Sequence, residues 1–156
     1  MYGQYDKVVC ISELTEKNLV SHVGAWIRKK VALIYNGIEV ESFGLQKFPQ
    51  ETLGKDILMV SAFREQKDQK TLIRALSLLP ETYRLNFAGG GEVWLIEECK
   101  TLAKEIGVEE RVCFLGVRRD VPELLRRADV VVLSSHYEGL SLSSLEGMAS
   151  GRPFIA

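Results

Sequence analysis

Short apolar runs alternate along the chain with longer segments in which apolar residues recur at helical spacing. Most of the runs are rich in β-branched residues and end in turn signals, which is typical of buried strands. We predict strands at residues 7–11, 31–35, 57–62, 85–88, 112–115 and 130–133, and a last strand opening at Pro153. This alternation predicts an α/β fold, a parallel sheet with helices on both faces.

Helices are expected between the strands. Ser12 is placed to cap a helix that ends near His22, and Asp120 with Pro122 begins another. The apolar face predicted for the helix over residues 68–79 consists of Leu72, Ala75, Leu76 and Leu79. The face predicted for residues 92–106 consists of Leu95, Cys99, Leu102 and Ile106.

Residues 39–55 interrupt this regular alternation. They combine scattered charge with Gly44, Pro49 and Gly54, a composition typical of a connector. We therefore expect a domain boundary in this segment, with one domain over residues 55–156. The chain ends inside an apolar strand, where unpaired backbone is costly, so we expect the 55–156 domain to be incomplete at its C-terminus.

Charge and cysteine content narrow the classes of partner. With 20 basic and 21 acidic residues among 156, the net charge of −1 argues against a broad surface for nucleic acid or anionic membranes. The three cysteines are widely spaced and form neither a disulfide framework nor a CxxC pair. No signal peptide and no membrane-spanning apolar run is visible. We expect a cytoplasmic protein, with peripheral membrane contact left open.

The most specific signal is the run YEGLSLSSLEGMASGRP, residues 137–153, in which Glu138 and Glu146 stand eight positions apart. A predicted strand leads into it, and residues 142–149 have helical spacing, so Glu138 is expected in a loop and Glu146 in the first two helical turns. The first amides of a helix suit a phosphate group. A carboxylate beside them suits sugar hydroxyls, because it accepts hydrogen bonds.

A purely structural interpretation of this run stays open. Ser143 and Glu146 fit the capping box Ser/Thr-x-x-Glu, which needs no ligand. Glu138 is not explained in this way, although a loop glutamate is usually only solvated. His136 beside the run could titrate near neutral pH, but a lone loop histidine is more often a spectator. Neither histidine has the spacing of a metal ligand.

Further loops follow predicted strands, where parallel sheets bind ligands. The first carries Arg64 and Lys67, which are cations for a diphosphate or ordinary surface side chains. The second, AGGGE at residues 88–92, lets a ligand approach the backbone, although Trp94 stands where a GxGxxG fingerprint needs glycine. The third, GVRRD at residues 116–120, could meet a base or phosphate, or is an ordinary turn before a capped helix.

Together these motifs resemble the retaining glycosyltransferases of family four, whose GT-B fold has two Rossmann-like domains facing each other across a cleft. The matching pieces, in the family's order, are CISE, VALIYNGIE, KDQKTLIRAL, FAGGGE, RVCFLGVRRDVPELLRRADVVVLSS and EGLSLSSLEGMASGRP. The resemblance implies transfer of a sugar from a nucleoside diphosphate sugar to an acceptor hydroxyl, with retention of configuration. It implies a role in polysaccharide, lipopolysaccharide or glycolipid synthesis.

The resemblance also implies residue roles. Glu138 would face the donor sugar near its reacting carbon, and Lys67 would neutralise the diphosphate, so these two are the implied catalytic residues. Glu146 would bind the ribose hydroxyls. The further donor-binding residues that it implies are Arg64, Gly90, Val117, Arg118, Gly139, Leu140, Ser141 and Leu142. No cofactor and no metal ion is expected.

Two departures from the family pattern affect these expectations. The family commonly has Gly-Arg-Leu or Gly-Arg-Phe where this chain has Ser61-Ala62-Phe63, and Arg64 is the candidate replacement for the missing arginine. Residues 1–50 resemble the end of the acceptor domain and the interdomain linker, but most of that domain is missing, so we expect donor binding with little or no turnover by this chain alone. Acceptor binding, to a sugar or a lipid-linked sugar, is assigned to the missing domain. The alternatives are a non-catalytic nucleotide-binding module and a GT-B-type epimerase or phosphorylase.

Overall fold

The computed structural model describes residues 2–43 and 55–156, which fall into two compact units. The first unit comprises Met1–Ile38 with Glu138–Leu142, and the second comprises Glu39–Tyr137 with Ser143–Ala156. Most of the predicted connector, residues 44–54, lies outside the described residues. The assignment of residues 1–50 to the end of an acceptor domain and its linker stays a prediction.

The first unit contains a two-stranded parallel sheet with helical turns. Its elements are η1 (Tyr2–Gln4), β1 (Val8–Cys10), α1 (Glu13–Val23), η2 (Ala25–Lys30) and β2 (Val31–Leu33), where η denotes a 3₁₀ helix. Ser12 caps α1 as predicted: its hydroxyl accepts a 3.2 Å hydrogen bond from the Thr15 amide. The Thr15 hydroxyl accepts one of 3.0 Å from the Ser12 amide, which completes a capping box.

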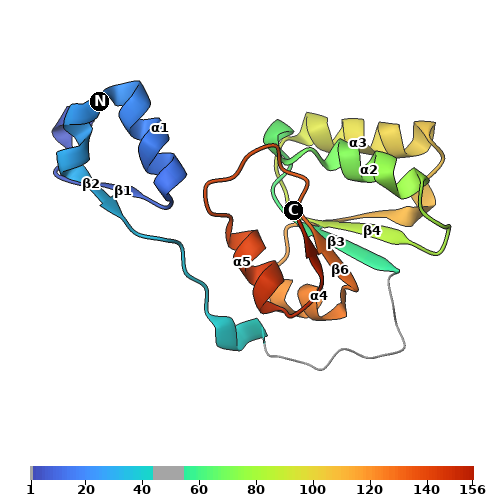
Figure 1. Ribbon diagram of the computed structural model, residues 1–156. Coiled ribbons are helices and arrows are strands. Elements are labelled where there is room, and N and C mark those ends of the chain that lie inside the picture. The colour runs from blue at the N-terminus through green and yellow to red at the C-terminus, as the bar shows by residue number, and fades with distance from the viewer. Residues whose placement is uncertain (1, 44–54) are drawn as a thin grey trace. The chain divides into compact units, whose positions relative to one another are not determined.

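The second unit is built on a five-stranded parallel sheet with the order β5-β4-β3-β6-β7 (Figure 1). Its strands are β3 (Asp56–Val60), β4 (Arg84–Ala88), β5 (Val112–Gly116), β6 (Val130–Val132) and β7 (Phe154–Ile155). From β3 the chain builds outward to β5, then returns and places β6 on the other side of β3. The strand order therefore reverses between β3 and β6, the place where such sheets bind ligands.

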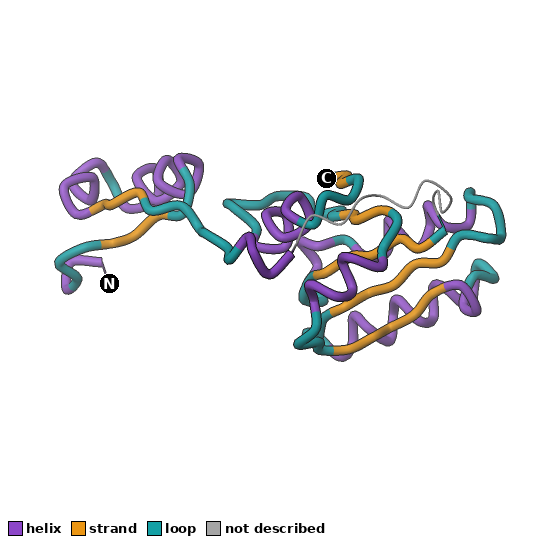
Figure 2. Tube along the Cα trace, turned by 90° about the horizontal axis from the view of Figure 1, so that it is seen from below, coloured by secondary structure: helices purple, strands orange, loops and turns teal. Residues whose placement is uncertain are grey.

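Helices cover both faces of this sheet, which confirms the predicted fold class (Figures 1 and 2). On one face lie α2 (Gln69–Ser77) and α3 (Val93–Glu105), and on the other lie α4 (Val121–Arg127) and α5 (Leu142–Ala149). Three short 3₁₀ helices complete the described elements, namely η3 (Val40–Phe43), η4 (Glu65–Lys67) and η5 (Glu109–Arg111). No helix within residues 2–43 and 55–156 is long and apolar enough to cross a bilayer.

The largest hydrophobic core lies between the sheet and the α2–α3 layer. The rings of Phe63, Phe87 and Phe114 meet there, with centroids 5.6 to 5.9 Å apart. Cys99 of α3 is fully buried beside them, and this burial raises the pKa of its thiol to about 11. The thiol is therefore protonated at neutral pH and acts as a core side chain.

The predicted apolar face of α2 is partly wrong. The helix buries Gln69, Ile73 and Leu76, whereas Ala75 and Leu79 are exposed. A buried glutamine was not expected, but its side-chain amide donates hydrogen bonds to the Ser61 hydroxyl (3.2 Å) and the Ala62 carbonyl (3.0 Å). These bonds satisfy the side-chain N–H donors, whereas the side-chain carbonyl oxygen of Gln69 has no hydrogen-bond partner among the described residues.

Candidate functional site

The candidate site in the second unit lies where the strand order of the sheet reverses. The loop after β3 carries Arg64 and Lys67, and the loop after β6 leads toward the Glu138 motif. Because β3 and β6 pair directly, through Ile57 with Val130 and Leu58 with Val131, their carboxyl ends are neighbours. The site therefore has two walls that are far apart in sequence.

Hydrogen bonds join these two loops. The His136 amide donates to the Gln66 carbonyl at 2.9 Å, and the Gln66 side-chain amide donates to the Tyr137 carbonyl at 3.1 Å. Asp68 follows with φ 45°, in the left-handed region, and its carboxylate caps α2 by accepting a 3.3 Å hydrogen bond from the Thr71 amide. The described contacts thus hold the segment that carries Lys67 from both sides.

The glycine loop packs against the chain itself. A Cβ on Gly89 would stand 1.9 Å from the Ser61 carbonyl oxygen, and a Cβ on Gly91 would stand 2.4 Å from the Phe63 carbonyl oxygen. Phe63 and Gly91 form a parallel bridge at this point. Both glycines also have positive φ, so the chain's own backbone explains them without a ligand. The role of Gly90 toward a ligand stays a prediction.

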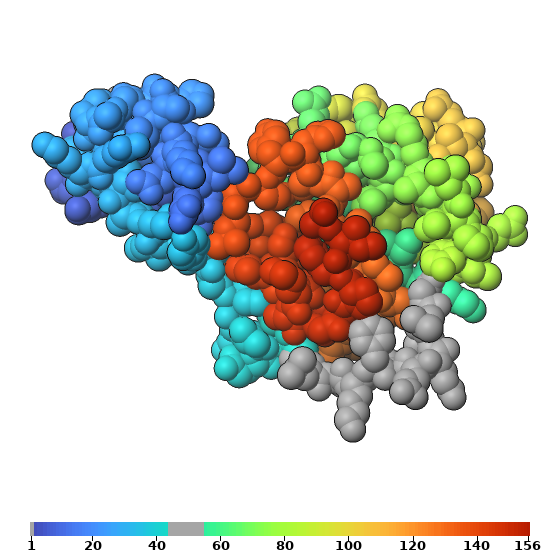
Figure 3. Space-filling view, in the orientation of Figure 1, coloured from blue at the N-terminus to red at the C-terminus, as the bar shows by residue number. Residues whose placement is uncertain are grey.

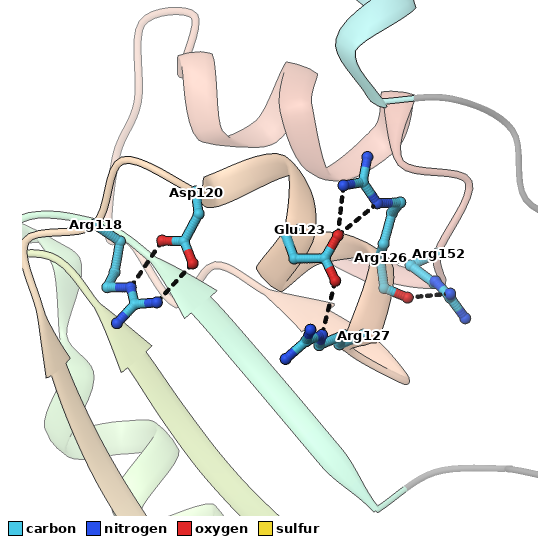
Figure 4. A network of polar contacts seen from close by, with 6 residues as sticks. All are labelled: Arg118, Asp120, Glu123, Arg126, Arg127 and Arg152. Atoms are coloured by element: carbon cyan, nitrogen blue, oxygen red, sulfur yellow. Dashed lines mark hydrogen bonds and ion pairs between the residues drawn. The ribbon is translucent and has the colours of Figure 1, made fainter.

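The third loop exposes one predicted residue and engages the other. Val117 is 81% exposed, and its Cγ2 would stand 2.8 Å from a Cβ on Gly90. The Arg118 guanidinium donates two hydrogen bonds to the Asp120 carboxylate, at 2.8 and 2.6 Å (Figure 4). These bonds hold the pKa of Asp120 below its usual value and raise the pKa of Arg118.

The charged side chains within α4 also form hydrogen bonds and ion pairs with one another (Figure 4). Glu123 accepts hydrogen bonds from Arg126, at 2.5 and 3.0 Å, and from Arg127, at 2.8 Å. Hydrogen bonds from Arg126 first, and then from Arg127, lower the pKa of Glu123. The Arg152 guanidinium donates to the Arg126 carbonyl oxygen.

Glu146 has a different environment. It lies in α5, which begins at Leu142, so Ser143 is inside the helix and the Ser143–Glu146 capping box does not describe this helix start. Burial raises the pKa of Glu146, and no described residue hydrogen-bonds or ion-pairs with its carboxylate. Figure 3 shows α5 and the strand after it (red) at the surface of the second unit.

The predicted site residues divide between the two units. Those of the first unit are Glu138, Gly139, Leu140, Ser141 and Leu142, and those of the second are Arg64, Lys67, Gly90, Val117, Arg118 and Glu146. Within the first unit, the Asn36 side-chain amide donates a 2.7 Å hydrogen bond to the Leu140 carbonyl. Asn36 was not among the predicted site residues, although it belongs to the matching piece VALIYNGIE.

Acidic, histidine and cysteine side chains do not form a metal site in the described part of the chain. Nowhere in residues 2–43 and 55–156 do three of them gather closely enough to hold an ion. The expectation that the protein works without a metal ion stays a prediction.

The sheet order and the cluster of loops at its reversal define a Rossmann-like domain. A family model described as glycosyl transferases group 1 matches residues 54–156. The chain therefore belongs to this family.

Individual proteins agree with this assignment. EpsD of Bacillus subtilis (strain 168) is 46% identical over 93 residues, which are 58% of this chain and 24% of EpsD. The mannosylfructose-phosphate synthase of Agrobacterium fabrum is 34% identical over 113 residues, which are 65% of this chain and 25% of that enzyme. The solved structure of Anabaena HepE in complex with UDP-glucose matches 98% of this chain and 45% of HepE, with a TM-score of 0.85 at 22% identity. The chain thus spans a minor part of each relative.

Proposed function

We propose that the chain carries the donor-binding part of a hexosyltransferase that uses a nucleoside diphosphate sugar and retains the anomeric configuration. Its product would be a polysaccharide, lipopolysaccharide or glycolipid, made in the cytoplasm by a protein that is soluble or peripherally bound to a membrane. The observation that carries the proposal is the Glu146 carboxylate, half-buried in α5 with no partner among the described residues. HepE, a fold neighbour, was solved with UDP-glucose.

The environment of Glu146 favours a ligand over a structural role. Burying a carboxylate without a partner is unfavourable, and both carboxylates shown in Figure 4, Asp120 before α4 and Glu123 within it, have an arginine partner. A pair of ribose hydroxyls would supply the missing donors, since each hydroxyl offers one proton to a carboxylate. A carboxylate with a perturbed pKa beside a ligand-binding edge is also a typical functional group.

The other residues would act on the diphosphate and the sugar. As the glycosidic bond breaks, negative charge grows on the leaving diphosphate, and Lys67, Arg64 and the amides near Leu140 and Ser141 would stabilise it. Glu138 would face the reacting carbon of the donor sugar. No step of this scheme requires a divalent ion.

The surroundings of Arg64 make Lys67 the first of the two cations to test. Arg64 lines a cavity of about 200 Å³ together with Lys70 and with Leu95 of α3. This places Arg64 beside the α2–α3 layer, and the family arginine position is occupied by Ala62, whose carbonyl binds Gln69. Arg64 would therefore replace the missing family arginine only if its own guanidinium binds the diphosphate.

The proposal is tested by titrating the chain with UDP, GDP and inorganic pyrophosphate. We expect Glu146→Ala to weaken nucleoside diphosphate binding at least tenfold, because hydrogen bonds to a charged group are worth about 1.5–3 kcal/mol. Pyrophosphate, which has no ribose, should bind this variant unchanged. Lys67→Ala should weaken all three ligands, and Glu123→Ala is the matched control that should weaken none.

Other outcomes would redirect the assignment. Unchanged UDP and GDP binding in both Glu146→Ala and Lys67→Ala would contradict the site. A loss of stability in Glu146→Ala without any ligand effect would indicate a non-catalytic module with a structural glutamate. We expect the chain to bind the donor and to show no transferase turnover by itself, which a radiolabelled sugar-transfer assay would check.

A further inference from the structure

The backbone of the lysine segment is held by a side chain from the neighbouring strand. Ser134 follows β6, and its hydroxyl oxygen lies 2.9 Å from the Lys67 carbonyl oxygen and 3.0 Å from the Asp68 carbonyl oxygen. These carbonyls belong to the junction between η4 and α2. One hydroxyl proton is therefore shared between two acceptors, a three-centre arrangement that is common at helix ends.

Local hydrogen bonds determine this junction only in part: the Lys67 amide donates to the Arg64 carbonyl at 2.9 Å, and Asp68 caps α2 through the Thr71 amide. The 3₁₀ helix η4 has three residues, and such turns have poor hydrogen-bond geometry of their own. Asp68 then adopts φ 45°, a conformation that non-glycine residues rarely adopt. The direction in which Lys67 leaves the backbone therefore depends on contacts made from outside the segment.

Ser134 is suited to supply such a contact because it stands on a rigid element. It directly follows Leu133, which is buried in the core, and β6 is paired on both sides, with β3 and with β7. Its hydroxyl also lies 3.7 Å from the sulfur of Met59, a fully buried residue of β3. Loss of this part-buried hydroxyl would leave the two carbonyls without their side-chain donor.

We propose that Ser134 is a positioning residue for Lys67, which fixes the lysine backbone so that the ammonium group meets the diphosphate of the donor. The inference rests on the proposed function, in which Lys67 binds that diphosphate. It assigns a contribution to donor affinity to the loop after β6. This loop precedes the Glu138 motif in the chain, and its contribution is separate from that of the motif.

The test compares hydroxyl removal with and without the lysine. We expect Ser134→Ala to weaken UDP and pyrophosphate binding three- to tenfold, measured by calorimetric titration. Ser134→Thr, which keeps the hydroxyl, should bind within twofold of the unmodified chain. Ser135→Ala is the matched control, because the buried Ser135 hydroxyl has no hydrogen-bond partner among the described residues.

A double-variant cycle separates positioning from a general structural role. In a Lys67→Ala background, Ser134→Ala should cause no further loss, since the group it positions is gone. An equal loss with and without Lys67 would overturn the inference, and so would undiminished UDP binding by Ser134→Ala. If Ser134→Ala fails to fold, Ser134→Cys keeps the volume with a weaker donor, and the same cycle applies. Failure of Lys67→Ala itself to weaken binding would count against the proposed function instead.

Discussion

Helices α4 and α5 cover the same face of the sheet but treat their acidic residues in opposite ways (Figure 1). Glu123 in α4 is paired with Arg126 and Arg127, and its pKa lies below the usual value. Glu146 in α5 has no such partner among residues 2–43 and 55–156, and burial raises its pKa. The charged side chains of α4 thus form ion pairs with one another, whereas α5 keeps a partly buried carboxylate at a cost in stability. Such a cost is expected where a ligand supplies the partner.

The two helices are also anchored differently. In α4 the fully buried side chain is Leu125, whereas in α5 the buried residue is Gly147. A Cβ on Gly147 would stand 2.8 Å from the Phe154 ring and 3.2 Å from the Val131 side chain. Helix α4 is therefore anchored by a buried side chain, and α5 is anchored by its close approach to β6 and β7.

The largest effect on stability is expected from truncating the buried side chain that anchors α4. Leu125→Ala should lower the free energy of unfolding by about 3 kcal/mol, because it removes apolar contacts and leaves a cavity. Urea denaturation followed by circular dichroism would measure this loss. Leu124→Ala is the matched control at a half-buried position and should cost clearly less. Equal losses in the two variants would show that α4 is not anchored through Leu125.

A smaller effect on stability is expected from adding a side chain where α5 approaches β6 and β7. Gly147→Ala should destabilise by about 1–2 kcal/mol, because overpacking at this contact outweighs the gain in helix propensity of about 1 kcal/mol. Met148→Ala, at the exposed neighbouring position, should stay within about 0.5 kcal/mol. In a Phe154→Ala background the same glycine substitution should no longer destabilise. A persistent penalty there would place the strain elsewhere.

The smallest effects are expected in the pH dependence, and they have opposite signs in the two helices. The raised pKa of Glu146 means that the folded state holds this proton more tightly, so its stability penalty is absent at low pH and develops as pH rises through both pKa values. The lowered pKa of Glu123 stabilises the fold above the unfolded pKa, and this contribution is lost as pH falls through the folded pKa.

Glutamine variants measure these two terms. At pH 7, Glu146→Gln should raise the melting temperature slightly, and Glu123→Gln should lower it slightly. Near about pH 3 both differences should shrink, because both carboxylates approach full protonation in the unfolded chain. Thermal unfolding at the two pH values would show this, and shifts of the same sign in both variants would contradict the contrast between α4 and α5.

The elements were largely predictable because their signals are local. The Ser12 cap, the strand pattern and the start of α4 near Asp120 depend on residues within one or two turns of each other. The apolar face of α2 was not predicted correctly, since burial of Gln69 depends on Ser61 and Ala62 in another loop. Sequence spacing alone does not show which acceptors will meet an amide.

The glycine loop shows the same limit within the site. Its glycines were interpreted as space for a ligand, but Gly89 and Gly91 are needed where the loop meets the backbone at Ser61 and Phe63. The matching motifs did identify Glu138, Glu146 and Lys67 as candidates. They did not identify Ser134, because a serine at a strand end carries no signal without its partner.

The sequence by itself determined the family, the order of strands and helices, and the chemistry of the candidate residues, because motifs and periodicity are properties of short segments. Only the tertiary structure decided which loops become neighbours, since pairing of β3 with β6 joins segments about seventy residues apart. It also decided that Arg118 is engaged with Asp120 while Glu146 is not paired by any described residue. Pairing and burial depend on distances between elements, and the pKa values of these groups follow from them.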